Sequence, residues 1–251
     1  MNTQGIDTQP TPQLKPSTWL DLILYLAVGF GLFSLAAFGM ALIFREFSVL
    51  TSLALYLLNV LFLTGTVYVL GVRRGKTTWS EIGFLPVVWR WEWLLVALGI
   101  SAVFIPIRLL VGLVIQLLFE GGLESLQGRA DILLAWGGFS WINFILTLLG
   151  AGLIAPISEE LYFRGLIHRW FQSRLEFWPR VVLSSAIFGL AHSDSVAVIA
   201  SSFVLGLVNA VAYERSKSLW LPIAMHMITN SIGVILLYLG MAIAQLPPSP
   251  P

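Results

Sequence analysis

The sequence has 251 residues, of which 57% are hydrophobic and 11% are charged, and its formal net charge is +1. Because soluble domains carry about 25% charged residues, this composition excludes an ordinary soluble protein and indicates one that crosses a lipid bilayer several times. The chain contains no cysteine, which excludes disulfides and thiolate catalysis. We expect no nucleic-acid partner.

The N-terminal half predicts three membrane helices, because its apolar runs reach the roughly 20 residues that a span requires. The polar tail before them lacks the pattern of a signal peptide. We divide this half into a tail over 1–17 and a unit over 18–138, with spans over 19–44 and 49–72 and a third that begins among Trp89, Trp91 and Trp93 and ends at Phe119.

The C-terminal unit, residues 139–244, differs because polar residues interrupt its apolar runs, and a tail over 245–251 follows it. One of these runs, 181–191, is too short to cross a bilayer at about 1.5 Å per residue. We expect a span from Phe139 to about Ile157, an interfacial helix or loop over 168–180, a short helix over 181–191, and helices over 196–213 and 219–244. The predicted fold class is all-α, a polytopic transmembrane helix bundle of about seven membrane helices, some of them partial.

The placement of Lys and Arg predicts the orientation of the bundle. If the N-terminus lies inside, eleven of the fourteen Lys and Arg residues fall in inner segments. The positive-inside rule therefore puts the N-terminus and the candidate site on the cytoplasmic side of a multi-pass membrane protein. Arg108, late in the third span, is expected to snorkel outward or to find a partner.

Two adjacent carboxylates, Glu159 and Glu160, stand at the end of the fourth apolar run, where ionised groups are costly and mark a function. Glu160 and Arg164 are four residues apart, so they share one helix face with the acid N-terminal to the base. Glu159 lies about 100° around that helix and has no local partner. One carboxylate is therefore neutralised, and the other is free to do chemistry.

Three segments bring polar side chains to similar depths in the inner half of the bilayer. At about 1.5 Å per residue, Glu159, His192, His226 and Asn230 lie roughly 9 to 18 Å from the inner surface. A lone intramembrane His is more often a packing residue, and a lone Asn more often a bond between helices. The conjunction of one acid and two imidazoles favours a functional site. The polar residues left outside it are His168, interpreted as surface, and Asn209, interpreted as helix packing.

Three short motifs carry a family resemblance over about residues 139 to 235. They are Glu159-Glu160-Leu-Tyr-Phe-Arg164, Phe188-Gly-Leu-Ala-His192 and His226-Met-Ile-Thr-Asn230. In order and separation they resemble the EExxxR, FxxxH and HxxxN motifs of the CAAX-protease and bacteriocin-processing family of intramembrane endopeptidases, also called the Abi or type II CAAX prenyl endopeptidase family. Each motif alone is weak, and the three together are specific.

The resemblance implies an intramembrane endopeptidase that hydrolyses a peptide bond in a membrane-associated protein or peptide, prenylated or not. It implies Glu159 as the base that activates water and His192 as the residue that holds or shares that water. His226 and Asn230 share a helix face and can both donate hydrogen bonds to an oxyanion. Supporting roles fall to Glu160 and Arg164, which fix the helix end, and to Phe188, which packs against the His192 ring.

The need for a metal is open at this point. Glu159, His192 and His226 are also a chemically suitable zinc set. The chain has no HExxH pair on one helix, which would be a stronger zinc signal, so the sequence favours a metal-free glutamate mechanism with zinc as the alternative cofactor.

Two other function classes also remain open. Intramembrane Glu and His residues mark proton relays, so a proton-coupled transporter is one alternative. The lack of an internal repeat argues mildly against it. The other alternative is a non-catalytic membrane scaffold of the same fold, against which the intact set of three motifs argues.

Overall fold

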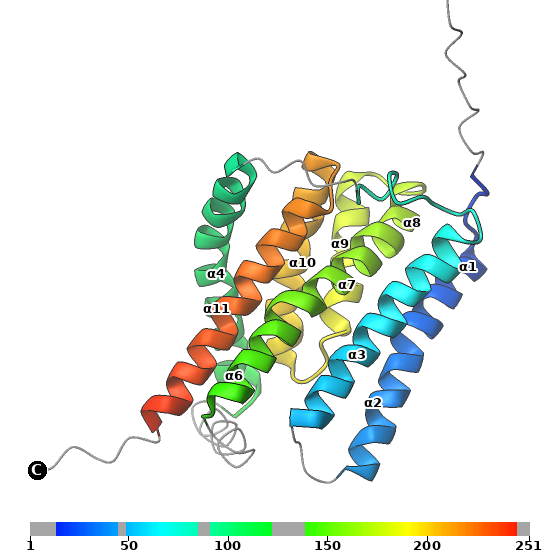
Figure 1. Cartoon of the computed structure of the whole chain (residues 1–251). Coiled ribbons are helices and arrows are strands. Elements are labelled where there is room, and N and C mark those ends of the chain that lie inside the picture. Colours follow the sequence, from blue (N-terminus) through cyan, green and yellow to red (C-terminus); the bar gives the residue numbers. More distant parts are fainter. Residues whose placement is uncertain (1–13, 45–48, 85–90, 122–138, 245–251) are drawn as a thin grey trace, which may run out of the picture.

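The computed structural model of the chain describes residues 14–44, 49–84, 91–121 and 139–244, and every regular element within these ranges is a helix (Figure 1). The predicted connection over 122–138 and most of both predicted tails lie outside the described residues. The N-terminal elements are α1 (Trp19–Tyr25), η1 (Leu26–Gly31), α2 (Leu32–Ile43), α3 (Val49–Thr66), η2 (Val67–Val72) and α4 (Trp91–Phe119). The C-terminal elements are α6 (Trp141–Thr147), η3 (Leu148–Ile154), α7 (Ala155–Tyr162), η4 (Phe163–His168), α8 (Arg169–Gln172), α9 (Phe177–Leu190), α10 (Val196–Ser216) and α11 (Trp220–Ala244).

Six of the described helices are long and apolar enough to cross a membrane, and α9 is a shorter apolar helix. The prediction of an all-α bundle of about seven membrane helices, some partial, is confirmed. Large apolar side chains such as Leu35, Leu57 and Leu118 are exposed on the outer faces of these helices. Exposed apolar area of this extent suits contact with lipid. The chain is therefore an integral, multi-pass membrane protein.

The fourth span differs from its prediction. Instead of ending near Ile157, the helix runs on without a break from Trp141 to Gln172, so Glu159 and Glu160 lie in its interior. It is π-helical in η3 and again in η4, on either side of the α-helical segment that carries the two acids. The interfacial segment expected over 168–180 is reduced to the short connection between α8 and α9.

Pro156 explains why the helix widens just before the acids. In the π-helical register the N–H of Ala155 donates to the carbonyl of Gly150. Pro156 has no N–H to continue that pattern, which leaves the carbonyl of Ala151 without its next donor. The side-chain amide of Asn230, from α11, donates to the Ala151 carbonyl at 3.1 Å. A side chain of the neighbouring helix thus supplies the bond that the proline removes.

The helix that carries the acids is held on several sides (Figure 1). On the α3 side, the hydroxyl of Ser158 donates to the side-chain oxygen of Asn59 at 2.8 Å. On the other side, α10 approaches α9 closely because Gly206 lacks a side chain, and a Cβ there would lie 3.0 Å from the Cβ of Ser185. The guanidinium of Arg164 donates to the Gly206 carbonyl at 3.2 Å. The acids are therefore fixed from both faces of their helix.

Candidate active site

Glu159 lies at the centre of the candidate site, and its side chain faces two imidazoles. Its Oε2 atom is 3.6 Å from Nε2 of His192 and 3.7 Å from Nε2 of His226. The residue is 8% exposed, and Oε2 has no hydrogen-bond partner among the described residues. The structure thus brings together the three residues that the sequence placed at similar depth, and it leaves one carboxylate oxygen unsatisfied between them.

Glu160 lies beside this group and is held by three side chains. Nε of Arg164 is 3.1 Å from Glu160 Oε2, and both side chains are fully buried. The Nδ1 atom of His226 lies 2.8 Å and the amide nitrogen of Asn209 lies 2.9 Å from Glu160 Oε1. The pairing with Arg164 matches the expectation from spacing. Because it also bonds His226, Glu160 helps to orient a residue that faces Glu159.

Asn209 was missed as a member of this group. The expectation of a helix-packing residue was too narrow, because the buried Asn209 amide bonds the Glu160 carboxylate. The sequence did contain an indication, because Asn209 is a polar residue within the apolar α10, and polar side chains inside membrane helices commonly pair with one another. Spacing could not have found it, because 49 residues separate Asn209 from Glu160 along the chain.

The hydrogen bonds of the two imidazoles define their free nitrogen atoms. His192 Nδ1 lies 2.8 Å from the carbonyl oxygen of Phe188, and a carbonyl only accepts, so Nδ1 carries the proton. His226 Nδ1 likewise donates to the carboxylate of Glu160. In the neutral rings Nε2 is then a lone-pair nitrogen, and in both residues it is Nε2 that faces Glu159. This arrangement suits the capture of a water proton.

Phe188 packs against the ring of His192, as expected, and it also contacts Arg164. Its ring centroid is 4.6 Å from that of His192 and 5.6 Å from that of His226. The guanidinium of Arg164 lies over the Phe188 ring, 4.7 Å from its centroid. A cation near an aromatic face is attracted to it. Phe188 therefore contacts both imidazoles and restricts their rotation.

Asn230 is on the same helix as His226, but its described contact is with η3 rather than with Glu159. One N–H of its amide donates to the Ala151 carbonyl. The amide has a second N–H. The structure therefore shows an interhelical bond for Asn230, and its catalytic role stays a prediction.

A zinc ion suits the donor chemistry of the site. Both Nε2 atoms are free to act as ligands, and the bond from His226 to Glu160 resembles the carboxylate contact that orients metal-binding histidines. Among the described residues, however, no three His, Asp or Glu side chains are grouped closely enough to hold a metal ion. The arrangement of these residues does not by itself make a metal site.

The interpretation of His168 as a surface residue was wrong. His168 is fully buried, with Nδ1 2.8 Å from the hydroxyl of Ser184 and Nε2 3.0 Å from Oε1 of Glu214. Glu214 also accepts bonds from Arg180, Gln172 and Lys217. Basic neighbours made the segment look interfacial. This second polar cluster ties η4 and α8 to α9 and α10.

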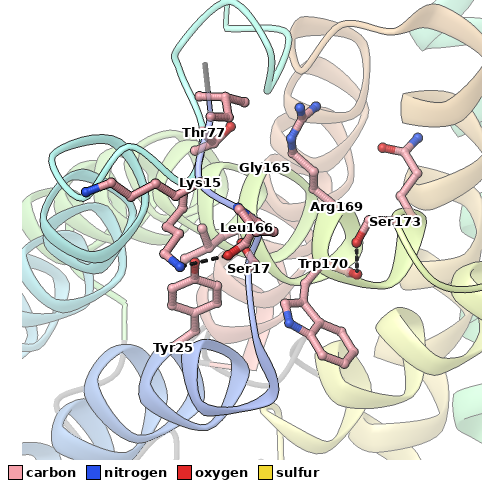
Figure 2. A pocket seen from close by; sticks show the side chains of 13 residues that line it. Lys15, Ser17, Tyr25, Thr77, Gly165, Leu166, Arg169, Trp170 and Ser173 are labelled. Carbon is pink, nitrogen blue, oxygen red and sulfur yellow. Dashed lines mark hydrogen bonds between the residues drawn. The ribbon is translucent and has the colours of Figure 1, made fainter. Parts of the chain in front are cut away.

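A cavity of about 350 Å³ lies at the end of the bundle where α1 begins and α8 ends. Its walls include Lys15 and Arg169 (Figure 2). Lys76 also lines it. Lys76 pairs with Asp21 at 2.9 Å, and Arg169 pairs with Glu81 at 3.3 Å. None of the candidate catalytic residues lines this cavity, so the chemistry of Glu159 belongs to a different place in the fold.

Comparisons with known proteins point to one family. Residues 141–232 match the sequence model of the type II CAAX prenyl endopeptidase Rce1-like family. The membrane-embedded CAAX protease MroQ of Staphylococcus aureus (strain USA300) is 26% identical over 195 residues, which cover 74% of this chain and 75% of that protein. No solved structure matches the chain at a comparable level.

Two further relatives match over shorter segments. An Escherichia coli protein described as an uncharacterized 24.3 kDa protein is 36% identical over 97 residues, 37% of this chain and 45% of that protein. YdiL of Bacillus subtilis (strain 168), named as a candidate membrane peptidase, is 31% identical over 91 residues, 36% of this chain and 37% of that protein. The chain thus spans less than half the length of these two relatives. The family resemblance of the three motifs is confirmed, and the match to the type II CAAX prenyl endopeptidase Rce1-like model covers the segment that carries them, residues 141–232.

Proposed function

We propose that the protein is an intramembrane endopeptidase that hydrolyses a peptide bond in a membrane-associated protein or peptide with a water molecule activated by Glu159. The observation that carries this proposal is the unsatisfied Oε2 of Glu159, which faces Nε2 of both His192 and His226. A carboxylate base and two imidazoles around one point supply the proton transfers that amide hydrolysis requires. The match of residues 141–232 and the similarity to MroQ, a membrane-embedded CAAX protease, support the same reaction class.

The proposed reaction begins with a water molecule between Glu159 and His192. As the water oxygen attacks the carbonyl carbon, Glu159 takes one of its protons, and the carbonyl oxygen becomes an oxyanion. Glu159 then returns that proton to the leaving amine as the C–N bond breaks. His192 accepts a hydrogen bond from the water at Nε2, because its Nδ1 proton is held by the Phe188 carbonyl. Glu159 thus acts first as a base and then as an acid.

We assign stabilisation of the oxyanion to His226 and Asn230. His226 can donate from Nε2 only as the imidazolium, for which Glu160 at Nδ1 is the counter-charge. Asn230 would donate through the N–H that does not bond Ala151. Removing one oxyanion donor lowers kcat by about 10²–10³, so Asn230→Ala should have that effect with KM nearly unchanged. If folded Asn230→Ala keeps its full kcat, Asn230 does not stabilise the oxyanion, and its only role is the hydrogen bond to Ala151.

We propose that this chemistry needs no metal, with zinc as the alternative cofactor. The support comes from the sequence, which has no HExxH pair on one helix, the stronger signal for zinc. If zinc were bound, Glu159, His192 and His226 would hold it, and it would polarise the substrate carbonyl or the attacking water. Zinc content of the purified protein, measured together with activity after chelation, decides between the two. Stoichiometric zinc whose removal abolishes activity would overturn the metal-free mechanism.

We further propose that the N-terminus and the site lie on the cytoplasmic side. The basic residues of the described inner segments gather at one end of the bundle, where Lys76 pairs with Asp21 of α1 and the Leu219 N–H donates to the Gly83 carbonyl. Such clustering supports a cytoplasmic location. A cysteine placed at Lys217 should be protected from impermeant thiol reagents in intact cells, while one at Ser140 should react. Labelling at Lys217 together with protection at Ser140 would show the opposite orientation and contradict the proposal.

Cleavage of a peptide library by detergent-purified protein tests the proposed function. The library should contain both prenylated and unmodified peptides. The relative MroQ is named as a CAAX protease, and whether this chain requires a lipid on its substrate is a separate question. Cleavage that is lost in Glu159→Ala supports the endopeptidase. Absence of cleavage combined with proton-coupled uptake in vesicles would favour a transporter, and absence of both would favour a scaffold.

A further inference from the structure

Arg108 lies on the inward face of α4, although it is deep in a membrane-spanning helix. Ala97, Ser101 and Gln116 are buried along α4 at intervals of helical turns, and Arg108 falls in the same stripe. Its side chain is partly buried. Of the two expectations for Arg108, snorkelling outward and finding a partner, the second is favoured, because this stripe faces α10 and α11 rather than lipid.

Contacts along α10 fix the level at which Arg108 lies. Ala97 packs against Ala212, while a Cβ on Gly112 would lie 3.5 Å from the Cβ of Ser201. The two helices are therefore antiparallel, and Arg108, one turn before Gly112, is level with the part of α10 around Phe203. The end of α9 packs at that same level, since a Cβ on Gly189 would lie 3.1 Å from the Cβ of Phe203.

His192 follows the end of α9 by two residues, so Arg108 lies near the catalytic group. Consistent with this, Arg108 interacts electrostatically with both Glu159 and His192. Yet across residues 14–44, 49–84, 91–121 and 139–244 its guanidinium makes no hydrogen bond and no ion pair. The neighbouring carboxylate of Glu160 is already held by Arg164, His226 and Asn209.

An intramembrane cation without a bonded anion is costly, and such residues commonly meet a ligand. A guanidinium presents a planar fork that matches a carboxylate better than it matches a single oxygen atom. Resting on the proposed endopeptidase activity, we propose that Arg108 binds a carboxylate of the peptide substrate and so sets which peptides reach Glu159. That carboxylate is either the C-terminus of the substrate or an acidic side chain close to the scissile bond.

The test uses three versions of one peptide that the purified protein cleaves. The first has a free C-terminal carboxylate, the second has a C-terminal amide, and in the third any acidic side chain near the cleavage point is replaced by its amide. A hydrogen bond to a charged group corresponds to a preference of about 10- to 150-fold. Wild-type protein should show that preference in kcat/KM for one of the two carboxylates, which identifies its source.

Arg108→Gln should remove the preference by raising KM for the carboxylate peptide, and its effect on hydrolysis of the amide peptide should be much smaller. Arg108→Lys should retain part of it, because charge remains while the fork is lost. Arg215→Gln is the matched control, because it removes one positive charge from the exposed end of α10. Arg215→Gln should not change kcat/KM for either peptide.

Two results would overturn the proposal. One is wild-type protein that cleaves all three peptides equally, a result that does not depend on whether any variant folds. The other is an equal loss on all peptides in folded Arg108→Gln, which would mean that Arg108 acts on Glu159, on the oxyanion or on the fold. If wild-type protein cleaves nothing, the proposed function fails by itself. Equilibrium binding of the acid and amide peptides to wild-type protein then still tests Arg108, and equal affinities would refute it.

Discussion

Two buried clusters in this molecule are built from the same residue types. In one, Glu160 forms an ion pair with Arg164 and hydrogen bonds with His226 and Asn209. In the other, whose members all lie toward one end of the bundle, Glu214 is bonded by Arg180, His168, Gln172 and Lys217.

The difference lies in the second nitrogen of each imidazole. Nε2 of His226 faces Glu159, whose Oε2 has no hydrogen-bond partner among the described side chains. The second nitrogen of His168 bonds the hydroxyl of Ser184 instead, which closes the chain of contacts. A carboxylate, an imidazole and a guanidinium therefore do not make an active site by themselves. The adjacent unsatisfied carboxylate makes the difference.

The two clusters also differ in exposure. The side chains of Glu160 and Arg164 are both at 0% exposure, whereas the Lys217 side chain that bonds Glu214 is 69% exposed. Water can replace an exposed donor, but it cannot easily replace a buried one. We therefore expect the Glu214 cluster to tolerate the loss of single members and the Glu160 cluster to be sensitive to it.

The largest expected effect on folding comes from the two arginines. Arg164→Ala leaves Glu160 buried without its cation, which should lower the free energy of unfolding by about 3–5 kcal/mol. Arg180→Ala leaves three donors on Glu214 and should lower it by only about 1–2 kcal/mol. Thermal and denaturant unfolding in detergent measure both. Equal losses in the two variants would remove the distinction between the clusters.

The two histidines should separate the clusters in rate. His226→Ala removes an oxyanion donor and should lower kcat by about 10²–10³. His168→Ala should lower stability while the folded fraction keeps its kcat, because His168 does not contact Glu159. Rates normalised to folded protein are the measurement. A comparable fall in kcat for His168→Ala would make the second cluster part of the active site.

A smaller difference is expected between the two amides. Asn209 is fully buried and bonds a charged group, so Asn209→Ala should cost about 1.5–3 kcal/mol. Gln172 is partly exposed and shares Glu214 Oε2 with Lys217, so Gln172→Ala should cost about 0.5–1.5 kcal/mol. Unfolding midpoints of the two variants, prepared in parallel, give the comparison. A more damaging Gln172→Ala would contradict the ranking by burial.

Local patterns predicted the first cluster better than the second. Glu160 and Arg164 are four residues apart, so helix geometry alone pairs them. The lengths of the apolar runs predicted the membrane spans. The depths estimated from helical rise predicted that Glu159 lies near the two imidazoles. His168, however, is paired with Glu214, which is 46 residues away. Whether a basic, aromatic segment lies at a surface depends on which helix covers it, and no local pattern reports that.

The length of the fourth helix was also underestimated for a physical reason. Two acids and an arginine look like the end of a span, because ionised groups do not face lipid. The structure satisfies them inward, through Asn209 and His226, so the helix continues past them to Gln172. Composition along one segment does not reveal partners contributed by other helices.

The central claim is the division of roles between the two adjacent acids, and parallel hydrolysis and unfolding measurements on Glu159→Gln and Glu160→Gln test it most directly. Glu159→Gln should lower the rate of peptide hydrolysis by about 10²–10⁴ with the unfolding midpoint unchanged, because it removes a general base that holds no other side chain in place. Glu160→Gln should lower the midpoint clearly, because Arg164 loses its counter-charge. Equal shifts of the midpoint in both variants, or full hydrolysis by Glu159→Gln, would contradict the account.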